Sequence, residues 1–224
     1  MTGARWSAWR RAASDFATVL IVSSALVTAA LALLRQSRQS AGRVTASGPV
    51  PDWAEYRRVA TWATGSAAGS DHEAIVFVEP GCAVCRSLLR ILDSVAAAHR
   101  VTVAVGYLHY PRPAAFPGAV QIAAQSECAR RQGLIRPFLE LTFSARDSAQ
   151  LAEAVKRADL DLGQLRQCAT DPMTLSLIDR HILIGRQLGI KSGGALLIDG
   201  VLIRAPVGSL SIDSVLAKGK VAVP

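Results

Sequence analysis

The sequence predicts an α/β fold with an inserted helical block and a single transmembrane helix ahead of it. Two short apolar runs, residues 74–78 and 101–108, flank a stretch with helical spacing, which is the pattern of a βαβ unit. Every segment from Pro111 to Gly189 then has the features of a helix. The chain closes with an apolar hairpin around Asp199-Gly200 and a last helix.

The first apolar segment is long enough to cross a membrane. Residues Phe16 to Leu34 are uncharged, and at 1.5 Å per residue they reach about 28 Å, close to a bilayer core. A cleaved signal peptide is the alternative, with Ala30–Ala32 as its cleavage site. We favour an uncleaved anchor because an ordinary signal core spans only about 7–15 residues. Both the anchor and the signal peptide place the rest of the chain in the periplasm. The uncleaved anchor predicts a single-pass inner-membrane protein.

The chain divides into six predicted parts, and composition limits what they bind. These parts are a cytoplasmic segment (1–15), the anchor (16–34), a linker (35–51), the first part of the α/β fold (52–110), the helical insertion (111–189) and the last part of the α/β fold (190–224). The net charge is +8, but the basic residues are scattered and not interleaved with aromatics. We therefore expect no nucleic-acid binding. An anionic membrane surface or an acidic partner suits the charge better.

Local patterns place the first helix and the strands. Trp53, Tyr56, Ala60 and Ala63 share one helical face, and Gly65 is the expected end of that helix. The branched, apolar run 74–78 predicts a central buried strand. The run 101–108 follows a helix that begins near Cys82, so the two strands should be parallel.

The stretch FVEPGCAVCRSLL carries the main chemical signal. It places Cys82 and Cys85 three positions apart, at the start of a predicted helix. Unpaired backbone N–H groups and the helix dipole favour a thiolate at such a position. We expect Cys82 to lie at the exposed start and act as nucleophile, with Cys85 resolving a mixed disulfide.

A zinc site and an inert structural disulfide are the two other interpretations of this pair. A tetrahedral zinc site needs four ligands, whereas Cys128 and Cys168 are single and the four histidines lack ligand spacing. We therefore expect no metal and no other cofactor. An inert structural disulfide remains an alternative to a redox-active pair.

The second pair, Cys128 and Cys168, falls on two separate predicted helices of the insertion. Two buried free cysteines are one interpretation, because cysteine packs well as a small hydrophobic residue. In an oxidising compartment a bridge is favoured, and four cysteines are an even number. We predict a structural disulfide that closes a loop of about 40 residues.

Five segments, in this order, resemble the DsbA-like branch of the thioredoxin superfamily. They are IVFVEPGCAVC, YLHYP, AAQSECARRQGLIRPFLELTF, LDLGQLRQCAT and LGIKSGGALLIDG, within Asp52 to Leu216. The resemblance implies a thioredoxin fold interrupted by a helical domain. It also implies thiol–disulfide oxidoreductase activity on exported proteins, with Cys82 and Cys85 as the redox-active centre.

The sequence departs from this resemblance at the loop expected to face Cys82. Members usually have a cis-proline there, whereas Gly194 follows Ser192 and Gly193 in this chain. A cis bond before a non-proline residue costs about 2.5–4 kcal/mol, so a trans peptide is expected. We expect Gly193, Gly194 and Ala195 to form a looser substrate-docking loop. If the protein is an enzyme and its fold accepts a cis bond there, Gly194→Pro should raise activity.

A second departure concerns proton transfer. Many relatives have a buried carboxylate six residues before the first cysteine, where this chain has Val76. Glu79 lies three residues before Cys82 and is the candidate proton-transfer group, although we favour a solvated Glu79 with no such role.

The sequence supports two functional hypotheses. The first is a membrane-anchored extracytoplasmic thiol–disulfide oxidoreductase that acts on exported protein thiols and exchanges electrons with a membrane redox partner. The alternative is a catalytically attenuated thioredoxin-fold accessory subunit of a larger membrane protein complex. The anchor and the two departures suit the second hypothesis, and the motif order favours the enzyme.

Overall fold

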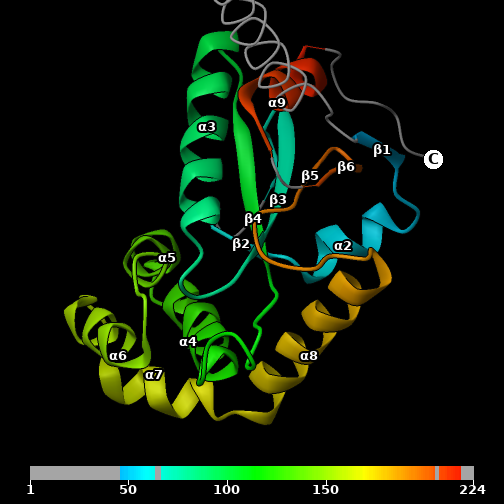
Figure 1. The fold of residues 1–224 in the computed structure, drawn as a ribbon. Helices are drawn as coiled ribbons and strands as arrows, with labels where there is room; N and C mark the ends of the chain where they lie inside the picture. The colour runs from blue at the N-terminus through cyan, green and yellow to red at the C-terminus, as the bar shows by residue number, and fades with distance from the viewer. Residues whose placement is uncertain (1–45, 64–66, 205–206, 218–224) are drawn as a thin grey trace, which may run out of the picture. The chain divides into compact units, whose positions relative to one another are not determined.

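The computed structural model describes residues 46–63, 67–204 and 207–217, which form one mixed sheet with helices on both faces (Figure 1). The strand order is β1-β6-β5-β3-β4-β2. The bounds are Ala46–Pro49 (β1), Thr61–Trp62 (β2), His72–Val78 (β3), Val103–His109 (β4), Leu196–Ile198 (β5) and Val201–Ile203 (β6). Strands β3 and β4 are parallel and the other neighbours are antiparallel.

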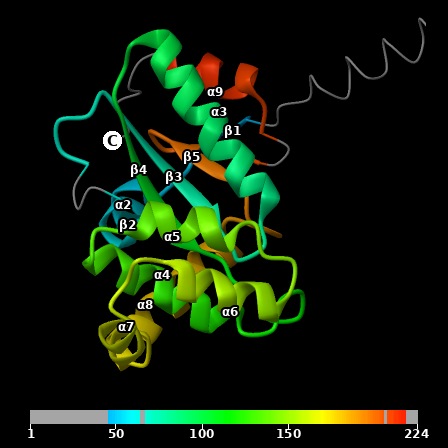
Figure 2. The same cartoon turned by 90° about the vertical axis from the view of Figure 1, so that its left-hand side faces the viewer.

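The helices fall into two groups. Their bounds are Trp53–Val59 (α2), Ala83–His99 (α3), Ala119–Arg131 (α4), Ile135–Thr142 (α5), Ser148–Arg157 (α6), Leu162–Ala169 (α7), Pro172–Gln187 (α8) and Ser209–Leu216 (α9). Helices α3 and α9 pack on one face of the sheet, and α2 and α8 pack on the other. Helices α4 to α7 form a block beyond one end of the sheet (Figure 2).

Strand β3 lies at the centre of this arrangement and all seven of its residues are buried. Because side chains alternate along a strand, Ala74, Val76 and Val78 contact the apolar cluster that includes α3 and α9. Ile75 and Phe77 contact the cluster that includes α2 and α8. The predicted central strand and the parallel βαβ unit β3–α3–β4 are therefore confirmed.

The predicted hairpin is also present, with Asp199 and Gly200 at its turn. Both residues have positive φ, 46° and 81°, as a tight two-residue turn requires. The Asp199 carboxylate accepts a hydrogen bond from the Glu73 N–H at 2.9 Å and lies 2.6 Å from His72 Nδ1. These contacts tie the turn of β5 and β6 to the start of β3.

Two local predictions differ from the structure. The first helix ends at Val59, and Thr61–Trp62 form an edge strand that pairs with Tyr107 and Gly106 of β4. The open edge of β4 offers hydrogen-bond partners that favour a strand over a further helical turn at the β-branched Thr61. Strand β1 lies within the predicted linker and pairs with β6.

The predicted anchor at residues 16–34 lies outside the described residues. Within the described ranges, no helix is long and apolar enough to cross a membrane.

Candidate functional site

Cys82 and Cys85 form a disulfide at the N-terminus of α3, with Cα atoms 5.2 Å apart. Strand β3 ends just before Pro80-Gly81, and the turn at Gly81, with φ of 70°, leads into the helix. Cys82 is the N-cap residue, and its Sγ accepts a hydrogen bond from the Cys85 N–H at 3.0 Å. The sulfur of Cys82 therefore faces a backbone donor of the first helical turn, as the sequence pattern predicts.

The two cysteines differ in their exposure to solvent. Cys82 is 8% exposed, less than expected for an exposed helix start, and Cys85 is fully buried. An external thiolate therefore has access to Cys82 only. The Cys85 Sγ lies 3.7 Å from the carbonyl oxygen of Phe77, which is placed to accept a hydrogen bond from a reduced Cys85 thiol.

The segment Gly193–Ala195 lies directly against this disulfide. A Cβ atom added to Gly193 would lie 2.8 Å from Cys85 Sγ and 3.1 Å from Cys82 Sγ. The Gly194 N–H donates to the Phe77 carbonyl at 2.8 Å, and the Phe77 N–H donates to the Ala195 carbonyl at 2.9 Å. These two main-chain hydrogen bonds fasten the loop to β3, and the expectation that it is looser than a loop with a cis-proline stays a prediction.

Gly194 itself has a conformation that a proline cannot adopt. Its φ is +90°, whereas the proline ring fixes φ near −65°. Its N–H is also used in the bond to Phe77, and proline has no N–H. On its other side, a Cβ at Gly194 would lie 2.8 Å from Cγ1 of Val84. In this conformation the loop does not accept a proline at position 194, so the condition on which a gain in activity from Gly194→Pro depends is not met.

Glu79 contacts the same loop through its carboxylate. Its Oε1 accepts a hydrogen bond from the Gly193 N–H at 2.9 Å, and only 8% of the residue is exposed. Arg112 donates through Nε to Oε2 at 2.6 Å and through a terminal nitrogen to Oε1 at 2.9 Å. The interpretation of Glu79 as a solvated residue is wrong.

Sequence reasoning missed Arg112. Its hydrogen bond with Glu79 raises the pKa of the guanidinium above its ordinary value, so the group stays charged. The one signal for its role is its position, shortly after β4 and between Pro111 and Pro113. Because β3 and β4 are parallel, the residues that follow their carboxyl ends meet at the same edge of the sheet.

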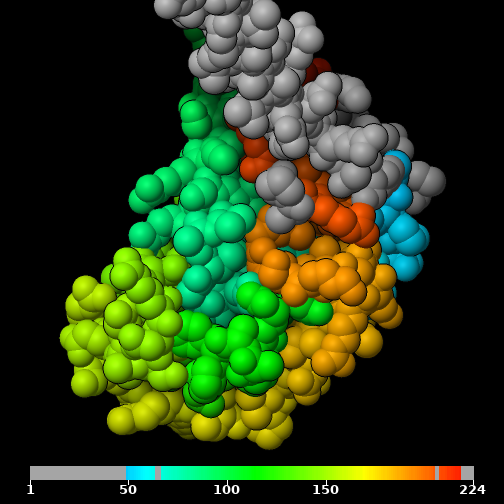
Figure 3. Space-filling model, viewed as in Figure 1, coloured from blue at the N-terminus to red at the C-terminus, as the bar shows by residue number. Residues whose placement is uncertain are grey.

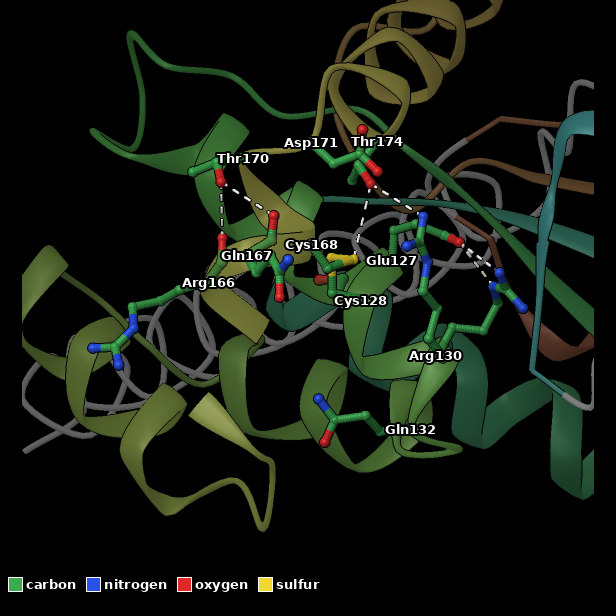
Figure 4. Close-up of a disulfide and its surroundings, with 12 residues drawn as sticks. Glu127, Cys128, Arg130, Gln132, Arg166, Gln167, Cys168, Thr170, Asp171 and Thr174 are labelled. Carbon is green, nitrogen blue, oxygen red and sulfur yellow. Dashed lines mark hydrogen bonds and ion pairs between the residues drawn. A yellow bond between two sulfur atoms is a disulfide. The ribbon is translucent and has the colours of Figure 1, made fainter. Parts of the chain in front are cut away.

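Cys128 and Cys168 form a second disulfide that joins α4 to α7 (Figure 4). Their Cα atoms are 5.8 Å apart, and Cys128 lies in an apolar cluster with Ala124, Leu165 and Ile178. Cys168 lies on the side of a surface hollow of about 490 Å³, and its Sγ is 3.8 Å from Thr174 Oγ1. The four cysteines thus form two separate pairs, one at the sheet edge and one inside the helical block.

Among the described residues, no group of three or more His, Cys, Asp and Glu side chains is arranged to hold a metal ion. The Cys82–Cys85 disulfide itself offers thiol–disulfide exchange as the chemistry of this site. Figure 3 shows the orange segment that leads into β5 beside the green segments around α3. The Gly193 backbone of that segment lies against both sulfur atoms.

Comparisons with known proteins support the fold. No protein-family model matches the chain, and no curated protein matches its sequence. A thioredoxin-like oxidoreductase from Silicibacter pomeroyi has a similar structure, with 17% identity, a TM-score of 0.59, and coverage of 68% of this chain and 88% of that one. BdbD from Bacillus subtilis has 11% identity, a TM-score of 0.59, and coverage of 78% and 97%.

A third similar structure is the thiol-disulfide exchange protein alpha-DsbA2 from Wolbachia pipientis. It has 11% identity and a TM-score of 0.57, and the match covers 74% of this chain and 92% of that one. Such low identities establish the fold alone. The thioredoxin-like α/β fold with added helices, which the resemblance in the sequence implied, is thereby confirmed.

Proposed function

We propose that the chain is a membrane-anchored, extracytoplasmic thiol–disulfide oxidoreductase that acts on exported proteins through Cys82 and Cys85. One observation carries this proposal. In a thioredoxin-like fold, a disulfide lies at the start of α3, only Cys82 of its two residues has any exposed surface, and Gly193 lies against both sulfurs. The similar structures whose names include an oxidoreductase and a thiol-disulfide exchange protein agree with it.

The reaction is two successive thiol–disulfide exchanges. A substrate thiolate attacks Cys82 Sγ, the bond to Cys85 breaks, and Cys85 leaves as a thiolate that takes up a proton. A second substrate thiolate then attacks the substrate sulfur of the mixed disulfide and releases Cys82. The substrate is oxidised by two electrons and the Cys82–Cys85 pair is reduced. A membrane redox partner removes these two electrons, and the same steps in reverse reduce a substrate disulfide.

The surroundings of the two sulfur atoms suit their separate roles. The Cys85 N–H lies 3.0 Å from Cys82 Sγ and stabilises negative charge there, so Cys82 is a good leaving group in the second exchange. The Phe77 carbonyl beside Cys85 Sγ accepts a hydrogen bond and so favours the protonated thiol over the thiolate. The reduced pair is therefore expected to hold a reactive Cys82 and a protonated Cys85.

The proposed location follows from the sequence. The apolar run at residues 16–34 is the proposed anchor, with residues 1–15 in the cytoplasm and the sheet and its helices outside. Two disulfides in one chain agree with an oxidising compartment.

The proposal is tested by turnover of the full-length chain in mild detergent. The substrate is a peptide with two cysteines, supplied reduced in one assay and oxidised in the other, with a small-molecule disulfide or thiol as the second reactant. We expect turnover that Cys82→Ser abolishes and that the double variant Cys128→Ala/Cys168→Ala retains. Equal rates for the wild type and Cys82→Ser would reject the enzyme.

The alternative function is a catalytically attenuated accessory subunit of a membrane complex. The observation that favours it is Gly194, since the backbone that faces the sulfurs is not set by a proline ring. This alternative predicts no turnover above the Cys82→Ser level and a larger complex that survives purification from membranes. A monomer with full turnover would reject it.

A further inference from the structure

We propose that Glu79 and Arg112 are a positioning pair that holds the Gly193-Gly194 peptide against the Cys82–Cys85 disulfide. This inference rests on the proposed function and deepens it. The pair fastens the substrate-docking loop by a side-chain hydrogen bond, at the place where a proline ring is absent. Glu79 therefore acts through the loop backbone and is not assigned the transfer of a proton.

The hydrogen bonds around the Glu79 carboxylate define its role. Oε1 accepts from both the Gly193 N–H and a terminal nitrogen of Arg112, and Oε2 accepts from Arg112 Nε. The two bonds from Arg112 fix the plane of the carboxylate, as in a bidentate arginine pair. A carboxylate fixed in this way presents Oε1 to the loop without a choice of rotamer.

Burial makes this arrangement depend on both partners. The Glu79 side chain is 8% exposed, whereas the Arg112 side chain is 44% exposed. A buried carboxylate without a partner is costly, so Arg112 is required to keep Glu79 in place. Arg112 in turn reaches solvent, and its removal leaves no cavity in the core.

Two neighbouring residues of the loop are each held by a hydrogen bond from their own N–H. Gly194 is held by the bond from its own N–H to the carbonyl of Phe77, a main-chain contact that substitutions at Glu79 or Arg112 do not remove. Gly193 is held by Glu79, and its α-carbon lies close to both the sulfurs and the Glu79 side chain, since an added Cβ would meet Cys85 Sγ at 2.8 Å and Glu79 Cγ at 3.0 Å. Loss of the Glu79 contact therefore frees the half of the loop that lies on the disulfide.

A freed loop should weaken substrate binding more than chemistry. A substrate strand that pairs with this backbone must then order it on binding, and that ordering reduces affinity. The sulfur atoms and the Cys85 N–H are unaffected, so the rate of exchange in the bound complex should change little. The expected signature is a raised KM with nearly unchanged kcat.

The first measurement is amide hydrogen exchange in the oxidised full-length protein, resolved at Gly193 and Gly194. We expect Glu79→Ala to speed exchange at Gly193 at least tenfold, which corresponds to about 1.4 kcal/mol. Arg112→Ala should have a similar effect and Arg112→Lys a smaller one. The matched control is Glu55→Ala, which breaks the ion pair with Arg180 between α2 and α8. Unchanged exchange at Gly193 in Glu79→Ala would overturn the proposal.

The second measurement is steady-state turnover of the dithiol peptide by the same variants. We expect KM to rise about tenfold in Glu79→Ala with kcat within about twofold, and partial recovery in Arg112→Lys relative to Arg112→Ala. A fall in kcat with a displaced pH profile and an unchanged KM would make Glu79 a proton-transfer group and reject the positioning role. If the wild type shows no turnover, the proposed function fails, and exchange at Gly193 alone then decides the role of the pair.

Discussion

At the scale of single residues, Gly194 controls how the loop meets the disulfide. Its φ of +90° and its hydrogen bond to the Phe77 carbonyl are both unavailable to proline. We therefore predict that Gly194→Pro lowers the free energy of unfolding by about 2 kcal/mol or more and reduces thiol turnover. Urea unfolding and the dithiol assay measure these effects.

The control for this substitution is Gly208→Ala. Gly208 has a negative φ, and an added Cβ would have no neighbour within 4 Å. Because Gly208 is the N-cap residue of α9, where alanine is less favourable than glycine, we expect a stability loss of no more than about 1 kcal/mol there. Wild-type stability together with higher turnover in Gly194→Pro would show that the loop adopts another conformation in solution.

The sequence identifies the residues of the site unequally well. Cys82 and Cys85 are found from their spacing and from the strand and helix patterns around them, which are local signals. The pairing of Glu79 with Arg112 joins positions 33 residues apart. The contact of Gly193 with Glu79 joins positions 114 residues apart. Such contacts depend on how the sheet brings chain segments together, so no local pattern reveals them.

At the scale of elements, the bond between Cys128 and Cys168 fastens α7 to α4. The closed loop spans 40 positions, and in the chain-entropy model such a cross-link contributes about 4 kcal/mol. We predict that Cys128→Ala/Cys168→Ala lowers the free energy of unfolding by about that amount. Alanine is chosen because Cys128 packs against apolar side chains that a serine hydroxyl would meet unpaired.

This prediction is checked by urea unfolding and by the dithiol assay. The pair lies on helices α4 and α7, apart from the sulfurs at the start of α3, so turnover under stabilising conditions should persist. Unchanged stability in the double variant would mean that the packing of α4 against α7 suffices without the bond.

Elements with strong local signals are predicted best. Asp161 and Asp171 each start a helix and accept hydrogen bonds from the first-turn N–H groups, as capping residues do. The sequence predicts a helix through Thr61–Trp62, because Ala60 and Ala63 continue its apolar spacing. In the structure these two residues pair with β4 instead. A local sequence pattern does not reveal such hydrogen bonds to a distant strand.

At the scale of the whole described molecule, two buried histidines lie where the sheet meets the insertion. His109 ends β4, and His181 lies in the middle of α8, with ring centroids 5.6 Å apart. The Nδ1 atom of His181 accepts from the His109 N–H at 3.3 Å, and its Nε2 lies 2.7 Å from the Val59 carbonyl oxygen. These contacts require a neutral His181 with its proton on Nε2.

Burial keeps both rings uncharged at neutral pH. It lowers the pKa of His181 to about 4, although the Val59 carbonyl and the Glu127 carboxylate act in the opposite direction. Burial, with the nearby His181, also holds the pKa of His109 well below its ordinary value. Because desolvation of a buried charge is the largest effect on both rings, protonation opposes folding.

The sign of the resulting pH dependence follows from proton binding. Between about pH 6.5 and pH 4 the unfolded chain protonates these histidines and the folded chain does not, so the unfolded state binds more protons. The free energy of unfolding should therefore fall as the pH falls through this window, and His181 alone should account for on the order of 3 kcal/mol. Urea midpoints at pH 7.5, 6, 5 and 4.5 measure the fall.

His181→Gln should reduce this fall in stability, because glutamine keeps a donor for the Val59 carbonyl and takes up no proton. The control His99→Gln changes a partly exposed histidine of α3 that is paired with Asp213, and it should leave the fall in place. A wild-type stability that is constant from pH 7.5 to pH 4.5 would mean that the two rings are not held neutral in the folded protein.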